Sequence, residues 1–173
     1  MSEENPRTPE IVSNTRQIIL FMGLEGSGNS TIARRLALEL GKPYIYVGEI
    51  IRRTAETDQS EFGEECRAML KESRYLKPEF VIELLTRRLS EPDTSEGFVL
   101  DGGTRTLEET EGLPGILEKT NRVMPVTVFH LRMPHWMSFE RLMSENGRRR
   151  EYDNVESILN RMKNYYNQLG KRA

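Results

Sequence analysis

The stretch GLEGSGNST, residues 23–31, decides how this chain folds. It follows QIILFM, residues 17–22, an apolar run rich in branched side chains that is typical of a buried strand. It leads into NSTIARRLALEL, residues 29–40, where apolar side chains recur at helical spacing. The glycines at positions 23 and 28, followed by Ser30, therefore lie between a strand and a helix. This spacing and context are typical of a phosphate-binding loop, or P-loop.

Glycines allow this loop to curl until successive backbone N–H groups face one anion, and the N-terminus of the helix adds a favourable dipole. The hydroxyl of Ser30 or Thr31 also suits contact with Mg²⁺. The residues that we expect to hold nucleotide phosphates are Gly23, Gly26, Ser27, Gly28, Ser30 and Thr31. The alternative is a glycine-rich turn that only joins the strand to the helix.

Asn29 stands where a P-loop carries a lysine. The charge of that lysine normally follows the transferring phosphoryl group, and removing one such donor lowers the rate by about 10²–10³. Asn29 can donate a neutral hydrogen bond, but its side chain is shorter and uncharged. We therefore expect nucleotide binding to survive and phosphoryl transfer to be weakened, with Asn29 at the transfer step.

The composition favours one globular domain. The chain has 173 residues with a formal net charge of -2, so no global field attracts nucleic acid. No apolar run reaches the ~20 residues of a membrane helix, and residues 1–16 form a polar lead-in that we expect to be flexible. The single cysteine, Cys66, excludes an intrachain disulfide and favours the cytoplasm. We expect a cytoplasmic monomer with no membrane or nucleic-acid partner.

Short apolar runs alternate with longer helical patterns along the chain. Strands are expected at residues 17–22, 44–47, 97–101 and 125–133, and helices at 29–40, 49–55, 60–73, 78–89, 106–120, 134–144 and 154–168. This alternation predicts an α/β fold with a parallel sheet over residues 17–173. A ligand crevice is then expected at the carboxyl ends of the strands.

Three further stretches carry a family resemblance: YVGEIIR (46–52), GFVLDGGTRT (97–106) and RREYDNVESILNRMKNYY (149–166). Together with the loop they resemble, in order, four motifs of the adenylate kinase family of nucleoside monophosphate kinases. The resemblance covers residues 17–166 and implies a three-layer P-loop fold with a central parallel sheet. It also implies a helical insert at about 49–89 that binds the monophosphate, a short lid at about 145–152, and Mg²⁺-dependent transfer from ATP to a nucleoside monophosphate.

The resemblance also implies roles for several charged residues. Arg52 and Arg105 would clamp the monophosphate, and Arg150 and Arg161 would face the transferring phosphoryl groups. Asp101, with Ser30, would serve the Mg²⁺ ion, Arg141 would lie against the ATP base, and Gly48 would lie beside the monophosphate. These types fit the chemistry, because in-line phosphoryl transfer needs positioning and positive charge. Taken singly, each arginine could instead belong to a solvated helix face.

Glu109 stands where adenylate kinases carry a glutamine that reads adenine. An ionised carboxylate only accepts hydrogen bonds, so it could accept from the amino group of adenine or cytosine. It could also accept from N1–H and the amino group of guanine, which would satisfy both oxygens. The alternative is that Glu109 is a solvated helix residue and that the base is held elsewhere.

The sequence departs from the family pattern mainly on its phosphate side. The departures are Glu25 and Asn29 in the loop, Val47 and Glu49 in the second motif, Gly103 and Thr104 in the third, and Glu145 after the predicted sixth helix. An alternative reading is therefore a catalytically impaired nucleotide-binding protein with a regulatory or assembly role. A deliberate change of lysine would account for Asn29 alone. Family members also continue into a fifth strand, so we expect thin cover on one flank of the P-loop strand.

Overall fold

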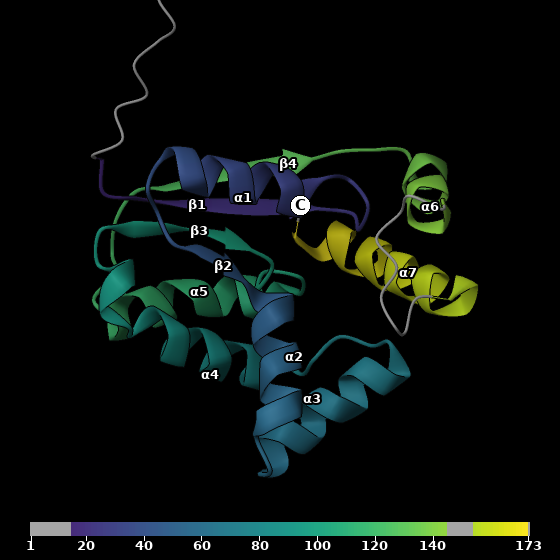
Figure 1. The fold of residues 1–173 in the computed structure, drawn as a ribbon, viewed down its shortest axis with the longest axis horizontal. Coiled ribbons are helices and arrows are strands. Elements are labelled where there is room, and N and C mark those ends of the chain that lie inside the picture. Colours follow the sequence, from purple (N-terminus) through teal and green to yellow (C-terminus); the bar gives the residue numbers. More distant parts are fainter. Residues whose placement is uncertain (1–14, 145–153, 173) are drawn as a thin grey trace, which may run out of the picture.

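The computed structural model describes residues 15–144 and 154–172 (Figure 1). Its elements are, in order, β1 (Gln17–Gly23), α1 (Asn29–Glu39), β2 (Tyr44–Tyr46), α2 (Val47–Thr57), α3 (Glu61–Glu72), α4 (Pro78–Leu89), the 3-10 helix η1 (Pro92–Thr94), β3 (Gly97–Asp101), α5 (Leu107–Lys119), β4 (Val126–Leu131), α6 (His135–Met143) and α7 (Val155–Arg172). The predicted alternation of strands and helices is confirmed.

The four strands form one parallel sheet in the order β2-β3-β1-β4. The P-loop strand β1 therefore lies inside the sheet, between β3 and β4. Phe21 is in register with Asp101, so β1 and β3 end side by side. The parallel arrangement brings the loop after β1 and the acidic end of β3 to the same edge of the sheet.

Side chains of the central strands alternate between two apolar layers. Ile18 and Leu20 face a core that includes buried residues of α2, α3, α4 and α5. Ile19 and Phe21 face the opposite side, where they pack with Ala33 of α1. The result is the predicted three-layer α/β architecture, with α1 on one face and the α4–α5 pair on the other (Figure 1).

Helices α2 and α3 project beyond the sheet at the bottom of Figure 1. Ser60 caps α3 by accepting a hydrogen bond from the N–H of Phe62 at 3.3 Å. Pro78 is in the first turn of α4, as the sequence predicted. Its missing N–H loses no hydrogen bond there, because N–H groups in the first turn have no partner within the helix. Val47, predicted as the last residue of a strand, is instead the buried first residue of α2. A branched side chain next to a strand gives no local signal that distinguishes these two positions.

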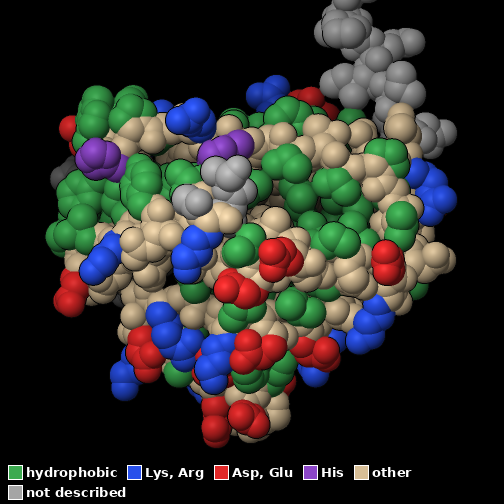
Figure 2. Space-filling model, turned by 180° about the vertical axis from the view of Figure 1, so that it is seen from behind, with side chains coloured by type: hydrophobic (Ala, Val, Ile, Leu, Met, Phe, Trp, Pro, Cys, Tyr) green, Lys and Arg blue, Asp and Glu red, His purple; other side chains and the backbone are tan. Residues whose placement is uncertain are grey.

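Strand β4 forms an edge of the sheet within the described residues and carries exposed apolar side chains. Val126, Val128 and Phe129 are all more than two-fifths exposed. We expected one flank of the P-loop strand to be thinly covered. The thinly covered strand is instead β4, because β1 is paired on both sides, with β3 and β4. Figure 2 shows apolar side chains across the upper part of the reverse face and charged ones gathered below.

In the described part of the chain, no helix is long and apolar enough to cross a membrane.

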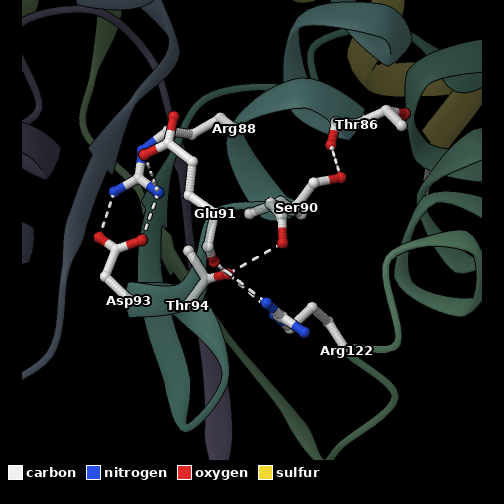
Figure 3. Close-up of polar contacts among 8 residues, drawn as sticks. Thr86, Arg88, Ser90, Glu91, Asp93, Thr94 and Arg122 are labelled. Atoms are coloured by element: carbon white, nitrogen blue, oxygen red, sulfur yellow. Dashed lines mark hydrogen bonds and ion pairs between the residues drawn. The ribbon is translucent and has the colours of Figure 1, made fainter.

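A polar cluster (Figure 3) joins the segment before β3 to the loop before β4. The Arg122 guanidinium donates to the Thr94 hydroxyl at 2.8 Å and to the carbonyl of Glu91 at 3.0 Å. Thr94 is fully buried and in turn donates to two backbone carbonyls. Beside it, Arg88 binds the carboxylate of Asp93 through two hydrogen bonds of 2.7 and 2.8 Å. This cluster fixes the η1 turn at the far end of the sheet from the loop.

Candidate functional site

The loop after β1 has the backbone of a phosphate cradle. Gly26 and Gly28 have φ angles of 82° and 97°, which favour glycine. Gly28 lies immediately before the first turn of α1. A Cβ atom on Gly26 would also lie 3.0 Å from the backbone oxygen of Ser138. Glycine at this position therefore serves both the curl of the loop and the close approach of α6.

A cavity opens at the carboxyl ends of β1 and β3, where a parallel sheet binds its ligands. The predicted site residues in its wall are Gly23, Gly26, Gly28, Asn29, Ser30, Thr31, Asp101, Arg105, Arg141 and Arg161. Further wall residues include Glu25, Tyr46, Tyr75, Thr104 and Tyr165, which the sequence did not single out as site residues. Segments far apart in the sequence thus meet around one space.

Ser30 and Asp101 are in direct contact at the bottom of this cavity. The Ser30 hydroxyl donates to Oδ2 of Asp101 at 2.6 Å, and the Tyr44 hydroxyl donates to the same oxygen at 2.8 Å. Burial, together with the charge and hydrogen bond of Asp101, raises the pKa of Tyr44, so the phenol stays a donor. Tyr44 was missed, because nothing in its local sequence points to the end of β3.

This pair of oxygens fits a magnesium ion bound with nucleotide. Mg²⁺ is held by one or two protein carboxylate or hydroxyl oxygens, with phosphates and water completing its shell. The described residues contain no group of three or more His, Cys, Asp or Glu side chains that could hold a metal ion alone. Ser30 and Asp101 are therefore suited to a phosphate-bound ion rather than to a metal site made of protein ligands only.

Asn29 turns back onto its own loop. In the amide orientation that satisfies both ends of the side chain, its nitrogen donates to the carbonyl of Met22 at 3.1 Å. Its oxygen accepts from the hydroxyl of Ser27 at 3.2 Å and from the N–H of Gly23 at 3.3 Å. The short side chain thus cross-links the cradle, and it brings no positive charge to the cavity.

Glu25, at the tip of the loop, pairs with Arg161 of α7. Nε of Arg161 donates to the Glu25 carboxylate at 2.5 Å, and the two side chains are 15% and 17% exposed. This ion pair joins positions 136 residues apart. The sequence marked Glu25 as a departure from the family pattern but gave no partner for it.

Helix α6 holds the loop from the other side. The buried hydroxyl of Ser138 donates to the backbone oxygen of Glu25. Nη1 of Arg141 lies 3.5 Å from the carbonyl of Gly26, so its guanidinium lies at the rim of the cavity. A small apolar cluster of Leu24, Leu142, Ile158 and Met162 packs α6 and α7 beneath the loop.

Two arginines of the predicted monophosphate clamp lie against tyrosine rings. The Arg105 guanidinium carbon lies 5.7 Å from the centre of the Tyr75 ring, and that of Arg52 lies 5.3 Å from the Tyr46 ring. Burial lowers the pKa of Arg105, but Tyr75, Tyr46 and nearby carboxylates outweigh it, so the net shift is upward. Arg105 therefore stays charged. Arg52 does not belong to the wall of the P-loop cavity.

Gly48 explains how the Tyr46 ring fits beside α2. A Cβ atom at position 48 would lie 2.8 Å from the ring and from the hydroxyl of Tyr46. Like Arg52, Gly48 does not belong to the wall of the P-loop cavity, and neither does Ser27. Ser27 instead donates its N–H to the carbonyl of Leu24 at 3.1 Å, which shapes the loop.

Glu109 is only 2% exposed, so the alternative that it is a solvated helix residue is wrong. Its carboxylate accepts from the N–H of Arg105 at 2.6 Å, and its own N–H donates to the Thr106 hydroxyl at 3.2 Å. This is a variant of the capping box that starts α5. Glu109 also lines a small cavity of its own, together with Val47 and Gly103.

Two predictions fall outside the described residues. Arg150, predicted to face the transferring phosphoryl groups, lies within residues 145–153. The predicted short lid at about 145–152, including Glu145, lies there too. Within the described residues, the wall of the P-loop cavity comes from the P-loop, the first turn of α1, the ends of β2 and β3, the loop before α4, the turn before α5, and helices α6 and α7.

Comparison with known proteins identifies relatives of this chain. A family model described as adenylate kinase matches residues 21–171. The chain is 35% identical over 147 residues to an adenylate kinase of Mycobacterium tuberculosis and 34% identical over the same length to that of Mycobacterium leprae, each covering 85% of this chain and 78% of the relative. An adenylate kinase of Thermotoga neapolitana is 32% identical over 126 residues, which cover 73% of this chain and 57% of that protein. The chain thus spans little more than half the length of the Thermotoga protein.

Proposed function

This chain belongs to the adenylate kinase family, and on that premise we propose that it transfers a phosphoryl group from ATP to a nucleoside monophosphate. The observation that carries the proposal is the contact of Ser30 with Asp101 beneath a glycine-rich cradle. Three arginines, Arg105, Arg141 and Arg161, face the same cavity. Phosphoryl transfer is catalysed by this kind of positioning and positive charge.

On the donor side, the ATP phosphates would lie against the loop N–H groups between Gly23 and Thr31. Ser30 and Asp101 would hold Mg²⁺ with its water shell. When bound, the ion neutralises charge that develops on the phosphate oxygens. Arg141, at the rim of the cavity, would lie toward the ATP base. Arg161 would face the transferring group from α7, and Arg150 is proposed for the same role.

On the acceptor side, Arg52 and Arg105 would clamp the monophosphate, with Gly48 leaving room beside them. Arg105 suits this role because it is charged and lies at the wall of the cavity. Glu109, in its small cavity beside Val47, would accept hydrogen bonds from the base. One carboxylate oxygen of Glu109 already accepts a hydrogen bond from the N–H of Arg105, which holds the carboxylate in place. We propose that the carboxylate held in this way contacts the base.

A second candidate function has its own support. The Asn29 amide binds the loop backbone and supplies no cation to the cavity. A catalytically impaired protein that binds nucleotide for a role in regulation or assembly is consistent with this. We also propose a cytoplasmic location, because the single cysteine is a buried free thiol of the kind that a reducing compartment preserves, and a monomeric state. Gel filtration tests that oligomeric state.

A coupled turnover assay with ATP and Mg²⁺ separates the two functions. AMP, CMP, UMP and GMP are offered in turn, and ATP binding is measured by calorimetry on the same protein. We expect turnover with at least one acceptor, abolished by excess chelator. ATP binding without turnover on any acceptor would favour the second function. Failure to bind ATP or any monophosphate would contradict both.

A further inference from the structure

Glu25 places a carboxylate inside a cavity that is proposed to bind anions. It lines the same wall as the loop glycines and as Arg161, to which it is paired at 2.5 Å. The pair is largely shielded from water, because both side chains are less than one-fifth exposed. Shielding of this kind makes a charge-assisted hydrogen bond stronger than an exposed ion pair.

The other charges in the cavity wall make this ion pair important for phosphate binding. Within the described residues, the wall carries the guanidinium groups of Arg105, Arg141 and Arg161 and the carboxylates of Glu25 and Asp101. Asn29 adds no charge to this balance. Of the three cations that these described residues offer to an incoming phosphate, Arg161 already binds an anion of the protein itself.

Both Glu25 and a phosphate offer oxygen acceptors to a guanidinium group, so they compete for the same donor atoms. Glu25 also adds to the negative potential that a phosphate meets at the loop. Backbone contacts keep Glu25 at this position: the hydroxyl of Ser138 donates to its carbonyl from α6. The carboxylate is thus held beside Arg161 by the loop and by a neighbouring helix.

We propose that Glu25 is an internal anion that occupies Arg161 and competes with nucleotide phosphate for it. Glu25 is then a positioning residue, which acts through Arg161 and sets the phosphate affinity of the loop. This inference rests on the proposed nucleotide-binding function of the cavity. If Glu25 instead only supported Arg161 in a position ready for phosphate, removing the carboxylate would weaken phosphate binding rather than strengthen it.

Calorimetry with inorganic tripolyphosphate, carried out on the whole chain, shows whether removing the carboxylate strengthens or weakens binding. Glu25→Gln keeps the size of the side chain and removes its charge. We expect this variant to bind tripolyphosphate about tenfold more tightly than the parent, since a hydrogen bond between charged groups contributes a factor of this order. Glu39→Gln is the matched control, because Glu39 pairs with Arg35 on the exposed face of α1. It removes the same charge and should leave the affinity within twofold.

A double-mutant cycle then tests whether the gain passes through Arg161. In an Arg161→Gln background, Glu25→Gln should change the affinity by less than about threefold, because the guanidinium is gone. Glu25→Asp keeps the charge but shortens its reach, so it should fall between the parent and Glu25→Gln. Thermal unfolding of each variant checks that the fold is intact.

The possible results distinguish this inference from the function on which it rests. Parent protein that binds tripolyphosphate, with equal or weaker binding by Glu25→Gln, overturns the inference and leaves nucleotide binding standing. An equal gain from Glu39→Gln, or a gain of the same size in the Arg161→Gln background, overturns it as well. Binding by neither the parent nor Glu25→Gln contradicts both. Binding by Glu25→Gln alone supports both.

Discussion

The hydroxyl of Ser30 donates a hydrogen bond of 2.6 Å to the carboxylate of Asp101, although the two residues are 71 positions apart. Ser30 lies in the first turn of α1, and Asp101 is the last residue of β3. Their contact follows from the parallel pairing of β1 with β3, which brings the two carboxyl ends together. It creates a pair of oxygens directly beneath the loop, where a phosphate-bound cation would lie.

Replacing Asp101 with Asn should have opposite effects with and without Mg²⁺. With Mg²⁺, we expect turnover to fall by about 10²–10³, because a group that supports the transition-state charge is lost. Without Mg²⁺, ATP should bind as tightly as before or more tightly, because a negative charge near its phosphates is removed. Turnover assays and calorimetry measure the two effects. Asp93→Asn, at the far end of the sheet, is the control, and equal behaviour of both variants would contradict the assignment.

Replacing Glu109 with Gln should change the choice of acceptor. The amide oxygen can still accept from the N–H of Arg105, so the start of α5 should be preserved. The amide group adds a donor that a carboxylate lacks, and we expect the ratio of kcat/KM for GMP to that for AMP to fall about tenfold. The exposed neighbour Glu108 provides the control as Glu108→Gln. An unchanged ratio would show that the base is recognised elsewhere.

Replacing Arg122 with Ala should destabilise the fold without affecting nucleotide binding. The change removes the donors that reach the buried Thr94 hydroxyl and the carbonyl of Glu91. We expect a loss of about 1–3 kcal/mol in the free energy of unfolding, measured with urea. Arg35→Ala removes an exposed pair with Glu39 on α1 and should cost about 0.5 kcal/mol or less. Similar losses in both variants would contradict the account of this cluster.

The buried thiol of Cys66 should make the protein less stable at high pH. Burial raises its pKa from 9.0 to about 11, so the unfolded chain loses this proton at a lower pH than the folded protein. Stability is therefore fully present below pH 9 and is lost as the pH rises toward 11, by up to about 1.4 kcal/mol per pH unit. Urea titrations across this window should show a shallower decline for Cys66→Ala. Parallel declines in the two proteins would rule out the thiol as a source.

The sequence predicted the sheet and its helices well, because each element carried a local signal. The branched run at residues 17–22, the glycine at its end and Pro78 each mark one boundary through local backbone preferences. The family membership suggested by four ordered motifs is confirmed by the match over residues 21–171. Val47 shows the limit of such signals, since its side chain suits either a strand or a buried helix start.

The contacts around the site were beyond the reach of sequence patterns. Glu25 and Arg161 meet only because α7 packs under the loop, and Tyr44 reaches Asp101 only because β2 lies beside β3. Glu109 is a further example, because a charged residue in a helical pattern is normally expected at the surface. Its burial follows from the hydrogen bond to the Arg105 N–H, which depends on the turn after β3.

Asn29 remains the residue on which the proposed activity depends most. We propose that the cavity serves phosphoryl transfer and lacks one cation at this position. The most direct test is the kcat of the parent, Asn29→Lys and Asn29→Met on the preferred acceptor. Methionine matches the length of lysine and has no charge. We predict measurable turnover by the parent, a rise of about 10²–10³ with lysine, and no rise with methionine. No turnover by the parent and no rise with lysine, in variants that bind ATP, would contradict the account.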